Sequence, residues 1–109
     1  MDFGQETSDL DQLFEAVAES FSVLSAPMRL RIISRLCYGE KTVKQLLSEI
    51  TTSQPNISQH LGMLHRAGFI QKRRAGNLIY YAIADQRVVQ VCQLMCANGK
   101  TKSLPAVNR

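Results

Sequence analysis

The 109-residue sequence contains few of the features that would place it outside the class of small globular proteins. It has only three Pro and six Gly residues, and 45% of it is hydrophobic, so extensive disorder is excluded. No apolar run is long enough for a membrane span, and the acidic N-terminus lacks the apolar segment of a signal peptide. We therefore expect one cytoplasmic domain. Its three cysteines are expected to be reduced, because an odd number argues against a disulfide framework.

Basic residues are missing from the first part of the chain. Six of the nine acidic residues lie among residues 1–20, where there is no Lys or Arg, so all 13 basic residues follow. The formal net charge is +4, and the later part is much more basic than this total indicates. A surface that binds a polyanion is therefore expected after residue 20.

Hydrophobic periodicity predicts a mainly α fold with a small β-hairpin, in the order α-α-α-α-β-β-α. Residues 1–8 are expected to form a flexible tail, with Ser8 or Asp9 capping a helix that begins near Leu10. Further helices are predicted over 27–37, from a capping box at Thr42 to about residue 50, and from a cap at Ser53 to residue 68. Strands are predicted over 69–74 and 78–83, a helix follows a cap at Asp85, and residues 99–109 form a basic tail. The expected domain is thus 9–98, and its first and last helices carry enough apolar surface to pair with a second subunit.

The segment from residue 53 to residue 70 has the pattern of a DNA-reading helix. Ile57, Leu61 and Leu64 lie on one face, and the opposite face carries short neutral polar side chains that suit base edges and phosphates. A basic strand and a turn follow. A helix followed by a basic hairpin predicts a winged helix-turn-helix that binds double-stranded DNA. The residues expected to face DNA are Ser53, Gln54, Asn56, Ser58, Gln59, His60, Arg73 and Arg74.

Two histidines and two tyrosines in this region are compatible with roles in packing or at the surface. A packed or capping role explains His60 as well as a DNA contact does, and His65 is expected on the solvated surface. The two are five residues apart, which is the wrong spacing for a metal pair on one helix face. Tyr80 and Tyr81 are expected to pack within the wing rather than stack on bases.

Three stretches resemble the ArsR/SmtB family of winged-helix repressors. They begin with Ser25-Ala-Pro-Met-Arg-Leu-Arg-Ile, continue with Ser58-Gln-His-Leu and Leu64-His-Arg-Ala-Gly-Phe-Ile, and end with Arg73-Arg-Ala-Gly-Asn-Leu-Ile-Tyr-Tyr-Ala-Ile. The resemblance covers more than half of the chain. It implies a homodimeric repressor that is released from its operator by an inducer. Two recognition helices would then lie about 34 Å apart, over one turn of DNA.

The cysteines are the candidate sensing residues. Cys92 and Cys96 are four residues apart and share one helix face, and Cys37 ends the second predicted helix. Thiolates select soft ions, so Cys37, Cys92 and Cys96 are expected to bind trivalent arsenic or antimony as the inducer, and DNA binding itself needs no cofactor. The known arsenic and cadmium members carry Cys-x-Cys on the third helix, where this chain has Lys41-Thr-Val-Lys-Gln, and the Asp/His pairs of the zinc members are also missing. Any metalloid site is therefore relocated.

Two other interpretations remain open. Another branch of the family senses persulfides or oxidants with one cysteine on the second helix and one on the last, which Cys37 and either Cys92 or Cys96 would match. Alternatively the thiols are inert core residues of a ligand-independent DNA- or protein-binding module. No Ser/His/Asp set, carboxylate pair or phosphate-binding Gly loop predicts an enzyme.

Overall fold

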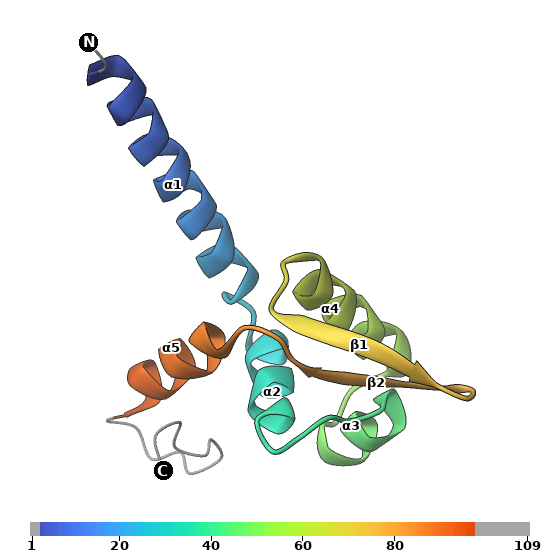
Figure 1. The fold of residues 1–109 in the computed structure, drawn as a ribbon. Helices are drawn as coiled ribbons and strands as arrows, with labels where there is room; N and C mark the ends of the chain where they lie inside the picture. Colours follow the sequence, from blue (N-terminus) through green and yellow to red (C-terminus); the bar gives the residue numbers. More distant parts are fainter. Residues whose placement is uncertain (1–2, 98–109) are drawn as a thin grey trace.

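Five helices and one hairpin make up the computed structural model, which describes residues 3–97 (Figure 1). The observed order is the predicted one, α-α-α-α-β-β-α, so the predicted fold class is confirmed. The predicted basic tail over 99–109 lies outside the described residues. The elements are α1 (Phe3–Val23), α2 (Pro27–Leu36), α3 (Val43–Glu49), α4 (Gln54–Arg66), β1 (Ile70–Ala75), β2 (Leu78–Ile83) and α5 (Gln86–Cys96).

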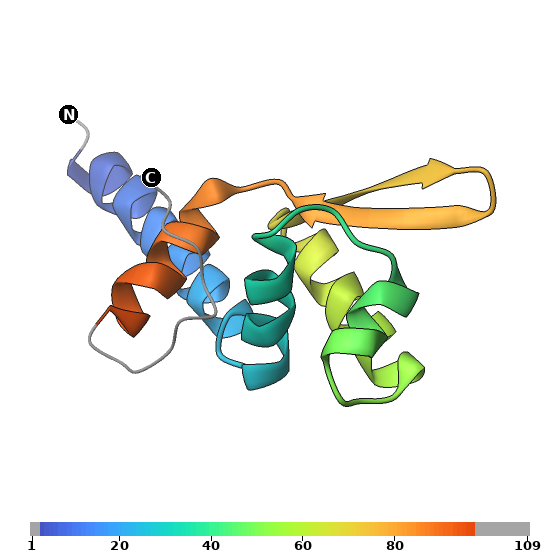
Figure 2. The same ribbon diagram turned by 90° about the horizontal axis from the view of Figure 1, so that it is seen from below.

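Helix α1 projects from the rest of the domain as a rod (Figures 1 and 2). It is present from Phe3, the first described residue, so the predicted tail is helical over residues 3–8 and the predicted cap at Ser8 or Asp9 is wrong. Gln5 and Glu6 have favourable helix propensities. Val23, at the end of α1, packs on the core. Its apolar stripe is exposed and consists of Leu10, Leu13, Phe14, Val17 and Phe21.

The core lies between α2, α3 and α4, and β1 and α5 add further buried residues to it. Ile32 and Ile33 of α2, Leu46 of α3, and the apolar face of α4 are fully buried. Burying one such side chain contributes about 1.5–3 kcal/mol, so this small set of residues fixes α4 against α2. The buried face of α4 is the predicted one, namely Ile57, Leu61 and Leu64.

Local sequence signals set the ends of α3 and α4. The capping box is present, since the Thr42 hydroxyl accepts from the Gln45 amide at 3.2 Å and the Gln45 side chain accepts from the Thr42 amide at 2.8 Å. The Ser53 hydroxyl caps α4, as predicted. After α4, Gly68 has a φ of +82°, which only glycine adopts without strain, and the chain turns into β1 there.

The hairpin is antiparallel, with Arg73 opposite Tyr80 and a two-residue turn at Gly76 and Asn77. Strand β1 is shifted one residue from the prediction, because its pairing extends to Ala75 opposite Leu78. A backbone bridge between Lys41 and Tyr81 adds the loop before α3 to the edge of β2. The hairpin extends beyond α3 and α4 (Figure 2).

Helix α5 packs its buried side on α2. Asp85 caps it as predicted, accepting from the Arg87 amide at 3.0 Å, and Val88, Val89 and Cys92 are buried. Leu94 and Met95, near the end of α5, are 75% and 79% exposed. Helices α1 and α5 therefore both leave apolar side chains uncovered, as the sequence predicted. Within residues 3–97, no helix combines the length and the apolar character that a membrane span requires.

Candidate nucleic-acid interface and thiol site

The outer face of α4 carries three exposed polar side chains. Gln54, Ser58 and Gln59 lie opposite the buried apolar stripe and project into solvent. Each has a neutral group that both donates and accepts hydrogen bonds. The structure thus places these three predicted residues on one exposed helix face. An α-helix fits the major groove of DNA, where such side chains can reach base edges.

Two of the predicted DNA-facing residues also build the turn before α4. The Ser53 hydroxyl accepts from the Asn56 amide at 3.2 Å, and the Asn56 side chain donates to the Thr52 hydroxyl at 2.9 Å. These bonds occupy the capping groups. Their first role in the free protein is to set the start of α4.

His60 lies on the flank of α4 that faces α2. It is partly buried, and its Nδ1 lies 3.0 Å from Nη1 of Arg29. Burial, and secondly the charge of Arg29, lower the pKa of His60. Both a packed role and a DNA contact were compatible with the sequence, and the structure gives this histidine a packed contact on at least one ring nitrogen.

The two predicted wing arginines have partners within the protein. Arg73 forms a bidentate ion pair with Glu40, with Nε–Oε1 and Nη2–Oε2 distances of 2.9 and 2.6 Å. Its guanidinium also lies 4.6 Å from the centre of the Tyr80 ring, which has the packing role expected of it. The hydrogen bonds from Arg73 lower the pKa of Glu40. Arg74 donates from Nε to the Gly76 carbonyl at 3.2 Å.

Sequence reasoning missed Glu40 and Arg29 as members of this surface. Glu40 is far from Arg73 in the chain, and no periodicity connects a loop carboxylate with a strand. The only indication in the sequence was that acidic residues are scarce in the basic part of the chain, where Glu40 is one of three after residue 20.

The three thiols lie in or beside the core between α2 and α5. Cys92 is buried, and Cys37 and Cys96 are half-buried. Burial, and secondly the charge of Cys92, raise the pKa of Cys37 to about 11. Burial, and secondly Cys96, raise the pKa of Cys92. The surroundings of Cys37 and Cys92 thus favour the protonated form of both thiols.

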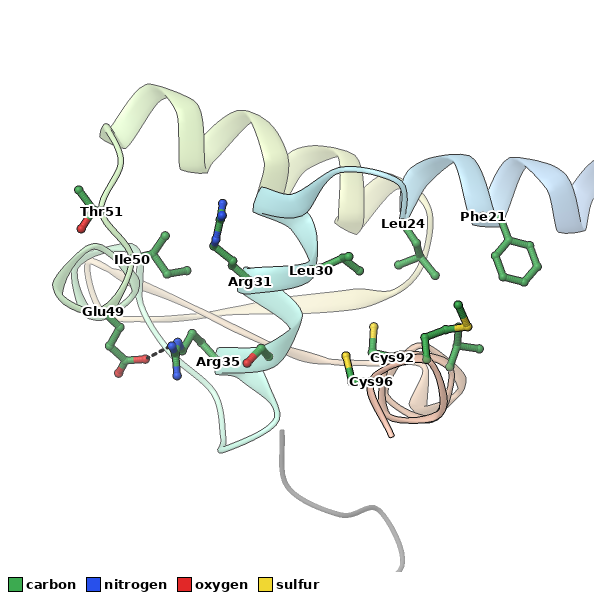
Figure 3. Close-up of a pocket in the computed structure, with 13 residues that line it drawn as sticks. Phe21, Leu24, Leu30, Arg31, Arg35, Glu49, Ile50, Thr51, Cys92 and Cys96 are labelled. Carbon is green, nitrogen blue, oxygen red and sulfur yellow. Dashed lines mark ion pairs between the residues drawn. The ribbon is translucent and has the colours of Figure 1, made fainter. Parts of the chain in front are cut away.

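An open cleft of about 860 Å³ reaches two of these thiols. Figure 3 shows Cys92 and Cys96 on α5 facing α2, which contributes Leu30, Arg31 and Arg35. Arg35 and Glu49 form a long ion pair of 4.0 Å at one side. Exposed apolar residues of α1 and α5 border the same cleft, so a second copy pairing through those helices would cover part of it.

The described residues do not hold a preformed metal centre. Among residues 3–97, no group of three or more His, Cys, Asp or Glu side chains is arranged to bind one ion. A site that uses all three cysteines would need side-chain or helix movement, or groups from a second subunit.

Comparisons with known proteins agree with this architecture. Residues 26–72 match the family described as "Bacterial regulatory protein, arsR family". An uncharacterised helix-turn-helix transcriptional regulator of Mycobacterium tuberculosis is 37% identical over 82 residues, covering 74% of this chain and 72% of that protein. The biofilm growth-associated repressor of Xylella fastidiosa is 31% identical over 96 residues, covering 84% of each chain.

Solved structures show the same fold. The repressor BigR from Xylella fastidiosa superposes with a TM-score of 0.76 at 28% identity, over 88% of this chain and 98% of that one. A homodimeric winged helix-turn-helix DNA-binding domain from Mycobacterium bovis gives 0.72 at 26% identity, over 88% and 91%. The matched residues 26–72 include α2, α3, α4 and the start of the wing. The chain therefore belongs to the arsR family of bacterial regulatory proteins, as a winged helix-turn-helix transcriptional regulator.

Proposed function

We propose that this regulator is a homodimeric repressor that binds an operator in double-stranded DNA and releases it when a covalent bridge joins Cys37 to Cys92. DNA binding is assigned to the outer face of α4, with the wing beside it. The second copy is assigned to the exposed stripes of α1 and α5. These stripes fit a homodimer, which is the state of the similar domain from Mycobacterium bovis.

The observation that supports the bridge is the placement of Cys37 and Cys92 on two helices that pack against each other, α2 and α5. Cys37 ends α2 and Cys92 lies in the middle of α5, and each belongs to the packed interior. Both thiols are at least partly buried at this packed junction, Cys92 in the core and Cys37 against it. A bridge between them would fix α5 to the helix that supports the recognition helix.

A persulfide can form this bridge with balanced chemistry. One cysteine thiolate attacks the sulfane sulfur of a low-molecular-weight persulfide, which leaves a cysteine persulfide and releases a thiol. The second cysteine thiolate attacks the cysteine-bound sulfur of that persulfide, releasing hydrogen sulfide and leaving a disulfide. The two cysteines are oxidised and the two sulfur atoms of the donor are reduced.

Trivalent arsenic or antimony is the second candidate inducer. Cys96 supports it, because this thiol lies one turn from Cys92 on α5, yet the two-cysteine scheme gives it no role. Without a preformed three-ligand group among residues 3–97, binding requires the thiols to move together. We therefore place the metalloid second.

The test uses release from DNA. The reduced wild-type protein first selects a duplex from a randomised pool, and fluorescence anisotropy then follows its release by glutathione persulfide or by antimonite. We expect persulfide to weaken binding by about 5- to 150-fold, the usual range of allosteric coupling, and reductant to restore it.

Single Cys-to-Ser variants identify the site. Cys37→Ser and Cys92→Ser should bind the duplex normally and resist the persulfide, while Cys96→Ser should respond like wild type. Release by antimonite that needs all three cysteines would replace the bridge with a metalloid site. Normal persulfide release of both the Cys37 and Cys92 variants would contradict the bridge and leave the thiols as core residues.

A further inference from the structure

Arg29 is a buried cation that contacts two other helices. It lies in the first turn of α2 and is only 8% exposed. Its Nε donates to the carbonyl of Val23 in α1 at 2.5 Å, and its Nη1 lies 3.0 Å from both His60 Nδ1 and Met63 Sδ in α4. A buried charge is costly unless its donors are satisfied, so this arrangement constrains α1, α2 and α4 together.

The contact with Val23 caps α1. Val23 is the last residue of that helix, whose last turn contains no basic residue. The guanidinium therefore supplies the positive charge that the carbonyl end of a helix favours. Arg29 thereby ties the exit of the projecting helix to the start of α2.

The contact with His60 determines the tautomer of that histidine. A guanidinium has N–H donors and no acceptor, so Nδ1 must present its lone pair. The ring proton of neutral His60 is then on Nε2. Within residues 3–97 no carboxylate is ion-paired with Arg29, so its charge faces the ring without compensation and opposes a second proton there.

We propose that Arg29 is a positioning residue for DNA binding, which holds His60 as the neutral Nε2–H tautomer so that this N–H donates to an acceptor of the operator. The inference rests on the proposed DNA-binding role of α4. Phosphate oxygens and the N7 and O6 atoms of guanine all accept such a bond. His60 is only partly buried and follows the exposed Gln59, and Arg29 contacts its Nδ1 rather than its Nε2.

Two substitutions of His60 test the roles of its two ring nitrogens separately. His60→Asn places an oxygen near the position of Nδ1, so it keeps an acceptor for Arg29 and loses the outer donor. His60→Gln places an amide N–H near the position of Nε2 and loses the inner acceptor. We expect the Asn variant to be the more stable of the two in thermal unfolding and to bind DNA about fivefold more weakly than wild type. The Gln variant should be less stable but bind DNA more tightly than the Asn variant.

The pH profile provides a readout that a purely structural role would not change. The pKa of His60 is lowered, so wild-type affinity should fall only as the pH drops below about 6.5. Protonation at Nδ1 then removes the acceptor for Arg29, because the N–H groups of both side chains would point at each other. The charged group that faces His60 from α2 is Arg29, and His65 and Arg66 lie on its own helix. His60→Gln should lose most of this pH dependence, while His65→Gln, the matched control on the exposed surface, should keep it.

Further arms of the experiment identify the acceptor and the outcomes that count against the inference. If the acceptor is a base, His60→Asn weakens binding to the selected duplex but not to a random duplex, whereas with a phosphate it weakens both equally. Wild-type affinity in a folded Asn variant, or an unchanged pH profile in the Gln variant, would overturn the inference while leaving DNA binding intact. Absence of binding by wild-type protein to any selected duplex would instead remove the proposed function.

Discussion

Replacing Glu40 with Gln should strengthen DNA binding and make it more sensitive to salt. In the free protein both carboxylate oxygens of Glu40 bind Arg73, at 2.9 and 2.6 Å. A phosphate must compete with this carboxylate for the same guanidinium face. The amide in the variant would be neutral, and the Tyr80 ring, 4.6 Å from the guanidinium, would still hold Arg73 at the wing.

The size of the effect follows from one additional phosphate contact in each protomer, and therefore two in the dimer. Each such contact adds about 0.9 to the steepness of the fall of log affinity with log salt. Raising the salt from about 0.05 to about 0.2 M should therefore cost Glu40→Gln roughly tenfold more affinity than wild type. Lowering the pH cannot substitute for the mutation near neutrality, because Arg73 lowers the pKa of Glu40 and keeps it ionised.

The assay is fluorescence anisotropy on the selected duplex over a series of salt concentrations. Glu49→Gln is the matched control, because it removes the same charge from ion pairs with Lys41 and Arg35 and leaves the pair of Arg73 with Glu40 in place. Arg73→Gln should make the affinity less dependent on salt. The double variant, Glu40→Gln with Arg73→Gln, should have the same salt dependence as Arg73→Gln alone. If the affinity of Glu40→Gln depends on salt no more steeply than that of wild type, the competition between Glu40 and phosphate is refuted. Glu40 would then orient Arg73 toward DNA.

Two further predictions concern α4 and the thiols. Gly62→Ala should stabilise the domain by roughly 0.5–1 kcal/mol in denaturant unfolding, because an added Cβ would meet only the flexible end of Arg66, at 3.3 Å; a lower midpoint would show that α4 needs the glycine for packing. Alkylation of Cys37 should be slow near neutral pH and accelerate about tenfold per pH unit until its pKa of about 11, as followed by mass spectrometry of the modified peptide; a plateau below about pH 9 would contradict the raised pKa.

The elements that sequence reasoning predicted well are those governed by local signals. The capping box at Thr42, the cap at Ser53 and the left-handed Gly68 each depend on residues within a few positions of one another, and each is present. The start of α1 was wrong for a related reason. Good caps at Ser8 and Asp9 predicted a boundary there, although a helix continues through potential cap residues when the preceding ones also favour it.

The surface proposed to bind DNA was predictable as a helix face but not as a set of contacts. Periodicity places Gln54 and Ser58 opposite the core of α4 without any tertiary information. The partners of Arg73 and His60 lie more than 30 residues away in the chain. An exposed arginine and a buried one look alike in sequence, so the packed role of Arg29 required the fold.

Helix α2 connects the thiols with the recognition helix, which yields a last prediction. Arg29 and Cys37 lie at its two ends, about 12 Å apart along the axis at 1.5 Å per residue. A short, packed helix shifts as a unit more easily than it bends, so a bridge to Cys92 should also move Arg29 against α4. Arg29→Lys keeps the charge but lacks the fork that reaches Val23 and His60 together.

The test compares the affinity of the reduced protein with that of the bridged protein, in wild type and in Arg29→Lys. If coupling passes through Arg29, the variant should show a smaller ratio of the two affinities as well as weaker binding in the reduced state. Cys37→Ser is the control, because it forms no bridge and should give a ratio near one. Equal losses in both states of Arg29→Lys would preserve the ratio, and would show that the bridge acts instead on the spacing of the two subunits through α5.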